Sequence, residues 1–365
     1  MTVIDSFPVG TGKICLMSAL TDILNFYKYG LRESDLFGLC EGNLFYFGGL
    51  KGKSQEELEN VNLLRELNMG GMKYDIMQMV GVLQNVLGLS VEGYRVDGMA
   101  ELKELVKSHV NGGIPLLALV LRYYLEYSVG YMEDNFSHTV TVYGYDMEQE
   151  KVYVTDTFVA TKPVSNYKGP LSMENFLKAF NLEKAVFEMV TNERLLAIHP
   201  KCQKSFESVP VSLLNRSLVN TALNNLEQKR LTGDIYTGTQ ALKRFIKEFV
   251  QWNEAYSPEF FRRLLQTLHS MITNYGGPYV TCELLAEYIQ AIYVRENRNI
   301  YREMAEELLE LSRLWLIVGN MCFKASLGKA EDVCGRITER LKILLDKEEA
   351  LYTRIVEGQN RLGVL

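Results

Sequence analysis

The chain has 365 residues, of which 47% are hydrophobic and 23% charged, and its formal net charge is −6. This composition excludes a disordered chain and a minimal disulfide-stapled module. The acidic balance, without a dense cluster of Lys and Arg, argues against nucleic acid as a partner. The length predicts two domains, because a domain contains about 150 residues on average.

The sequence carries no pattern typical of export or membrane insertion. The longest apolar run, Ile114 to Leu121, is much shorter than the ~20 residues that a membrane span needs. The opening residues 1–5 lack the basic and apolar pattern of a secretion signal. The six cysteines form no CxxC pair, which is typical of reduced thiols. We therefore expect a cytoplasmic protein with no membrane partner and no metal site.

The first predicted element is a helix that follows Thr11-Gly12 and ends at Gly30, since glycine often terminates helices. Cys15 falls in the first turn of this helix. Its apolar stripe at helical spacing consists of Met17, Leu20, Leu24 and Tyr27. The same kind of periodicity predicts further helices at 54–67, 73–87, 98–112 and 172–180.

Three strands are predicted between these helices. Residues 114–121 form a continuous apolar run that Pro115 opens, as in a strand buried on both faces. Residues 138–143 and 151–156 alternate between apolar and polar, and a polar turn joins them, which predicts a β-hairpin. If the hairpin pairs His138 directly with Asp156, their Cβ atoms lie about 5 Å apart.

From Pro210 onward, almost every segment has helical period. Helices are predicted at 210–229, 238–253, 258–274, 279–294, 298–326 and 330–357. The sequence therefore predicts an α+β domain over residues 1–204 with an antiparallel sheet, followed by an all-α domain over 205–365. A short linker is expected around His199 to Lys204. The negative net charge lies in the first half, because the charges of residues 206–365 balance.

Cys15 is the sharpest candidate for chemistry. The first turn of a helix has unpaired N–H groups and a partial positive charge, which favour a thiolate and could later hold an oxyanion. The alternative is a small residue buried under the helix, where free cysteines are commonly found.

His138 and Asp156 are the second candidate pair. A carboxylate beside an imidazole holds the ring in one orientation and stabilises its protonated form. The alternative is a surface histidine beside an aspartate that ends a strand. With Cys15, the pair gives the order Cys, His, Asp, which papain-like cysteine enzymes use. The other histidines, His109, His199 and His269, are interpreted as structural.

Several segments together resemble the butirosin biosynthesis protein H family. The N-terminal domain of that family is matched by the helix from Cys15 to Leu20, by Gly30, and by the run from Leu31 to Phe47. The downstream segments 114–125, 137–146 and 152–156 follow the same layout of buried strand, His strand and Asp strand. The C-terminal half, with Gly276-Gly277 and Arg298 to Trp315, resembles the helical domain appended in that family.

The resemblance implies a papain-like core related to C39-type bacteriocin-leader peptidases, and a cysteine acyltransferase of antibiotic biosynthesis. Such an enzyme moves an aminoacyl group from the phosphopantetheine arm of an acyl or peptidyl carrier protein to a small amine acceptor, without a cofactor of its own. On this chain, Cys15 would take the acyl group, His138 would be the base and Asp156 would orient it. Residues 1–14 contain no Gln, so the second oxyanion donor is unassigned.

Two other functions stay open at this point. The same three side chains could hydrolyse an amide or a thioester, as a peptidase, amidase or thioesterase, because only exclusion of water and an acceptor pocket separate transfer from hydrolysis. Alternatively, the protein could be a noncatalytic partner in a biosynthetic assembly.

Overall fold

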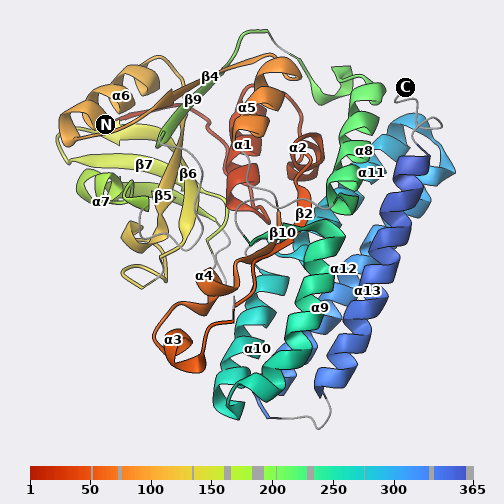
Figure 1. The fold of residues 1–365 in the computed structure, drawn as a ribbon. Helices are drawn as coiled ribbons and strands as arrows, with labels where there is room; N and C mark the ends of the chain where they lie inside the picture. The colour runs from red at the N-terminus through yellow and green to blue at the C-terminus, as the bar shows by residue number, and fades with distance from the viewer. Residues whose placement is uncertain are drawn as a thin grey trace. The chain divides into compact units, whose positions relative to one another are not determined.

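The computed structural model describes residues 1–358 except 51, 73–75, 134, 160–165, 183–192, 203, 228–233, 275 and 329–332. The chain divides into two compact units (Figure 1). Unit 1 contains Met1–Leu36 and Asp75–Val209, and unit 2 contains Phe37–Tyr74 and Pro210–Leu365. The units therefore differ from the expected division at residue 204, because residues 37–74 fold with the C-terminal half.

Unit 1 is built on an antiparallel sheet. Its strands are β1 (Thr2–Val3), β4 (Leu89–Tyr94), β5 (Leu116–Leu121), β6 (Ser137–Asp146), β7 (Lys151–Asp156), β8 (Tyr167–Ser172) and β9 (Leu195–Pro200). The strand order is β4-β9-β5-β6-β7-β8, and β1 pairs with β6. The helical segments of this part are α1 (Cys15–Phe26), α5 (Ile76–Asn85), α6 (Met99–Asn111), η1 (Arg122–Tyr124), α7 (Met173–Lys178) and η3 (Phe206–Ser208). Helix α2 (Glu33–Leu39) begins in unit 1 and ends in unit 2. Residues 199 and 200 belong to β9, so the predicted linker was placed partly inside a strand.

The apolar run of β5 lies where the sequence predicted a fully buried strand. Every residue of β5 is at most 2% exposed. The strand pairs with β6 on one side and with β9 on the other. Burial on both faces therefore explains why this strand lacks the alternation of its neighbour β6.

The β6–β7 hairpin has a different register from the expected one, and the expectation that His138 faces Asp156 directly is wrong. Thr141 pairs with Thr155, two residues from the partner that the expected register assigns. The difference arises because β6 continues to Asp146, which shortens the turn. A two-residue offset keeps both side chains on one face, since strand side chains alternate with period two.

A β-bulge in β6 produces this offset of two residues. Tyr143 is an extra residue between the pairs on either side of it, and Gly144 pairs with Tyr153 beyond it. Without the extra residue, the register at the turn would put His138 and Asp156 on opposite faces of the sheet. The bulge therefore determines which side chains can meet.

Unit 2 combines a small sheet with long helices (Figure 1). Its strands β2 (Asn43–Phe47), β3 (Met69–Met72) and β10 (Tyr236–Thr237) lie in the order β10-β2-β3. Its helices are α3 (Gln55–Glu59), α4 (Leu63–Leu67), α8 (Val211–Leu226), α9 (Gly238–Ala255), α10 (Pro258–Thr273), α11 (Pro278–Glu296), α12 (Asn299–Ser326) and α13 (Val333–Glu357). Together with unit 1 this confirms the α+β class. The pairing of β2 with β10 joins residues 37–74 to this unit.

The predicted helix at 54–67 is two short helices. Asn62 caps α4 by accepting a hydrogen bond from the Leu64 amide through its side chain, and Ser54 caps α3 in a capping box with Glu57. A side chain that satisfies a free helical N–H starts a new helix at that point. The long C-terminal helices begin and end close to their predicted bounds.

Unit 2 buries one carboxyl group in its core. Glu348 of α13 is 3% exposed, and its Oε1 accepts a hydrogen bond of 3.0 Å from the Trp315 indole nitrogen of α12. Burial raises the pKa of Glu348 from 4.5 to about 7, against the lowering effect of that hydrogen bond. The folded protein thus holds a proton that the unfolded chain loses at lower pH.

We expect Glu348→Gln to flatten the pH dependence of stability. In the wild type the free energy of unfolding should decrease by about 3 kcal/mol as the pH rises from about 4.5 to about 7, because the folded pKa lies above the unfolded one. Urea unfolding across this range measures the effect. The exposed Asp346→Asn is the matched control and should retain the wild-type slope. A slope that Glu348→Gln leaves unchanged would show that the carboxyl group titrates normally.

Candidate active site

His138 and Asp156 form a buried pair in unit 1. The Nε2 atom of His138 lies 2.8 Å from Oδ2 of Asp156. The two residues are 5% and 2% exposed. They lie diagonally on the same sheet face, where a histidine and an aspartate can still reach each other. The hydrogen bond occupies Nε2 and leaves Nδ1 of the ring for another partner.

Cys15 is the other group that interacts with this imidazole. It is the first residue of α1, as the sequence predicted, and the helix starts after Ile14 without a side-chain cap. The charge of Cys15 and a side-chain hydrogen bond to it both raise the pKa of His138. The structure therefore brings together all three residues that sequence analysis singled out.

The charges of these groups are mutually stabilising. Burial alone lowers the pKa of His138, but the charges of Asp156 and Cys15 and hydrogen bonds to both raise it from 6.5 to about 10. Burial alone would raise the pKa of Asp156, yet the charge and hydrogen bond of His138 outweigh burial and hold it below 3.8. At neutral pH the pair is an imidazolium and a carboxylate.

Glu33 fixes the segment that precedes Cys15. Its carboxylate accepts hydrogen bonds from the amides of Lys13, at 2.9 Å, and Ile14, at 2.7 Å. It also accepts a hydrogen bond of 3.0 Å from the Ser18 hydroxyl. A carboxylate at a helix N-terminus satisfies free N–H groups and interacts favourably with the helix dipole. Sequence analysis missed this role, because Glu33 lies beyond the end of the helix that it anchors.

Asp156 is held by more than the histidine. Its Oδ2 also accepts a hydrogen bond of 2.9 Å from the Tyr127 hydroxyl, and its Oδ1 accepts one of 2.9 Å from the Phe158 amide. Sequence analysis missed this contact. No local pattern marks it, because Tyr127 lies in a loop 29 residues away in sequence.

The other histidines have partners outside this site. His109 contacts the Leu105 carbonyl oxygen at 2.8 Å, and His269 contacts the Gly319 carbonyl oxygen at 3.0 Å. His199 lies 3.5 Å from a carboxylate oxygen of Glu92. Among the cysteines, three are buried (Cys40, Cys282 and Cys322), whereas Cys202 is exposed. No group of three potential metal ligands occurs in the described part of the chain.

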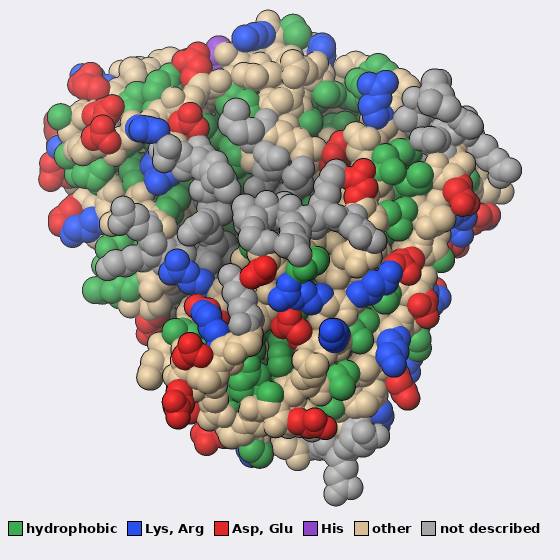
Figure 2. Space-filling model, viewed as in Figure 1, with side chains coloured by type: hydrophobic (Ala, Val, Ile, Leu, Met, Phe, Trp, Pro, Cys, Tyr) green, Lys and Arg blue, Asp and Glu red, His purple; other side chains and the backbone are tan. Residues whose placement is uncertain are grey.

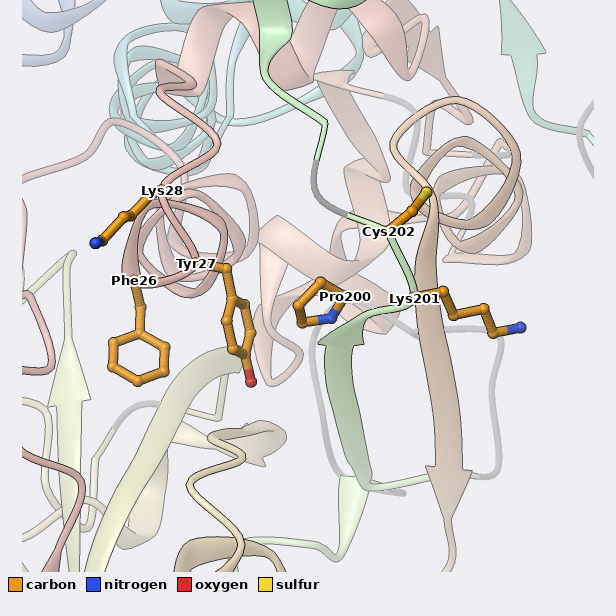
Figure 3. A pocket seen from close by; sticks show the side chains of 6 residues that line it. All are labelled: Phe26, Tyr27, Lys28, Pro200, Lys201 and Cys202. Atoms are coloured by element: carbon orange, nitrogen blue, oxygen red, sulfur yellow. The ribbon is translucent and has the colours of Figure 1, made fainter.

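A separate hollow of about 390 Å³ lies elsewhere in unit 1 (Figure 3). Its lining consists of Phe26, Tyr27, Lys28, Pro200, Lys201 and Cys202. The side chains of Lys28 and Lys201 extend away from each other in Figure 3, so their charges do not converge on one point. None of the three candidate residues lines this hollow, which therefore plays no part in the site.

The viewed face carries acidic and basic side chains interspersed, without a continuous basic patch (Figure 2). Within the described ranges, none of the helices combines the length and the apolar character that crossing a bilayer requires.

We expect Asp156→Asn to remove a pH-dependent part of the stability. The raised pKa of His138 stabilises the fold fully below about pH 6.5, and this contribution decreases as the pH rises to about 10. As the pH falls below about 4, protonation of Asp156 removes the same contribution. The difference in unfolding free energy from wild type should therefore be largest near pH 5–6, at about 3 kcal/mol. A difference independent of pH would contradict an ion pair.

Glu33→Gln should destabilise unit 1. The side-chain NH2 group of Gln is a donor, and it would face one of the two backbone amides that now donate to the Glu33 carboxylate. We expect a loss of about 1–3 kcal/mol in chemical unfolding. Ser18→Ala is the control, since it removes one of the three donors and leaves both amides paired, and it should cost less. Equal losses in the two variants would show that the amides do not depend on Glu33.

A search of curated proteins finds no match to this chain. Residues 14–157 match the model of a family described as butirosin biosynthesis protein H, N-terminal. The matched segment contains Cys15, His138 and Asp156. The candidate site therefore lies within the segment that is similar to this family.

Proposed function

We propose that the protein is a cysteine-dependent acyltransferase of specialised-metabolite biosynthesis, with Cys15, His138 and Asp156 as its catalytic residues. The observation that carries the proposal is the imidazole of His138, which Asp156 binds at 2.8 Å and which interacts with the thiol at the start of α1. A buried imidazolium beside a thiol stabilises the thiolate, the reactive form of cysteine. The similarity to this family supports a biosynthetic role.

The reaction would proceed in two steps. The Cys15 thiolate attacks the carbonyl carbon of an acyl thioester, and the C–S bond to the phosphopantetheine sulfur breaks as the acyl–Cys15 bond forms. His138 gives its proton to the departing sulfur. In the second step, an acceptor amine attacks the acyl–Cys15 carbonyl, His138 takes the proton that the amine loses, and Cys15 leaves as the thiolate. Asp156 orients the ring in both steps.

The Cys15 amide is our candidate for one oxyanion donor. It lies at the N-terminus of α1, where amide N–H groups and the helix dipole favour negative charge. The amides of Lys13 and Ile14 are bound by Glu33 and so are not available for this role. The second donor stays unassigned.

The proposed partners follow from the same chemistry. The donor would be an acyl or peptidyl carrier protein and the acceptor a small amine. Carrier proteins of this kind are acidic, and residues 1–205 carry the net negative charge of the chain, whereas the charges of residues 206–365 balance. Like-charge repulsion therefore favours docking of the carrier on the helical half.

Intact-mass measurement with a loaded carrier protein tests the proposal. We expect the wild type to gain the mass of the acyl group, and Cys15→Ala to gain none. Cys202→Ala is the matched control, because it removes an exposed thiol outside the site, and it should acylate like the wild type. His138→Gln should slow acylation at least about 100-fold, in line with the loss of a general base.

The same experiment separates the rival functions. Turnover of the adduct only when an amine is added supports transfer, whereas rapid turnover in buffer alone supports a hydrolase. Absence of any adduct on Cys15 with a set of loaded carriers would contradict the proposal and favour a noncatalytic partner. Each outcome is read from the protein mass and from the released product.

A further inference from the structure

The carboxylate that orients His138 is shared with a tyrosine. Oδ2 of Asp156 accepts hydrogen bonds from His138, at 2.8 Å, and from Tyr127, at 2.9 Å. A single oxygen with two donors is fixed in position by both of them. The proposed triad therefore has a fourth member, Tyr127, which contacts Asp156.

Tyr127 is itself held in place from two directions. Its ring stacks on that of Tyr167 with centroids 3.8 Å apart and planes 7° from parallel. Tyr167 pairs with Asp156 in the β7–β8 ladder. In the loop, the buried Arg122 donates a hydrogen bond of 2.8 Å to Ser128, which directly follows Tyr127. A side chain restrained in this way can position its partner.

We propose that Tyr127 is a positioning residue that fixes the Asp156 carboxylate and, through it, the His138 ring toward Cys15. The inference rests on the proposed function and deepens it. Loss of the Tyr127 hydroxyl would leave the carboxylate with Phe158 and His138 as its hydrogen-bond donors. A carboxylate that can rotate stabilises the imidazolium less, and the thiolate–imidazolium pair then persists over a narrower range of pH.

The groups that can affect the pH range of the thiolate–imidazolium pair lie on the elements around it. They are Cys15 of α1, His138 of β6, Asp156 of β7, Tyr167 of β8, and Tyr127 and Arg122 of the segment after β5. Tyr167 provides a matched control. It has the same stacked ring, but its hydroxyl donates to the Pro170 carbonyl oxygen at 2.8 Å and not to Asp156.

The test is the pH dependence of Cys15 alkylation by iodoacetamide, in Tyr127→Phe and in Tyr167→Phe. Peptide mapping separates Cys15 from the other cysteines, and exposed Cys202 gives a reference alkylation profile in the same sample. Both variants retain the ring stack, and melting temperatures check the fold. In the wild type we expect rapid alkylation of Cys15 to begin at a lower pH than in His138→Gln, because the protonated imidazole stabilises the thiolate.

We expect Tyr127→Phe to raise the pH at which Cys15 alkylation begins by about half a pH unit, the size expected for one hydrogen bond, and Tyr167→Phe to leave it unchanged. An onset of Cys15 alkylation that Tyr127→Phe leaves unchanged, or lowers, overturns the inference alone. A Cys15 profile in the wild type that matches Cys202 contradicts the proposed function, and the inference with it.

Discussion

The account depends on one buried interaction, the ion pair between His138 and Asp156. Two ionisable groups that are almost fully buried carry a large desolvation cost, and only close opposite charges and hydrogen bonds can offset it. The 2.8 Å contact, with further donors from Tyr127 and Phe158, provides that compensation. The same contact makes the ring a stable imidazolium beside Cys15.

Backbone geometry determines whether that interaction can form. The extra residue in β6 shifts the pairing of the hairpin by one residue, which puts the two side chains on one face of the sheet. On the other side of the site, Glu33 holds the amides just before Cys15 and so fixes where α1 begins. Two local features, the bulge and the hydrogen bonds of Glu33, thus fix the backbone on the two sides of the site.

The sequence allowed some of these features to be predicted and not others. A continuous apolar run predicts the buried strand β5, and an apolar stripe predicts α1 with Cys15 in its first turn. The predicted end of this helix at Gly30 is wrong, because α1 ends at Phe26. The exact register was not predictable, because the bulge at Tyr143 and the length of the turn have no signal in the local sequence pattern. Tyr127 was missed for a similar reason, since a loop residue reveals its partner only in the folded chain.

The division of the chain was also harder to predict than its elements. Residues 37–74 read like a continuation of the first half, but β2 pairs with β10 and β3, and this small sheet belongs with the helices of unit 2. Long-range strand pairing of this kind has no signal in composition or charge. Helix bounds were closer, because caps and glycines act locally.

The most direct test of the central claim is an NMR titration of the His138 ring in the wild type and in Cys15→Ala. The account predicts that the pKa of His138 falls when Cys15 is replaced, since the charge and hydrogen bond of the sulfur both raise it. An unchanged titration of His138 would show that the sulfur and the imidazole do not meet.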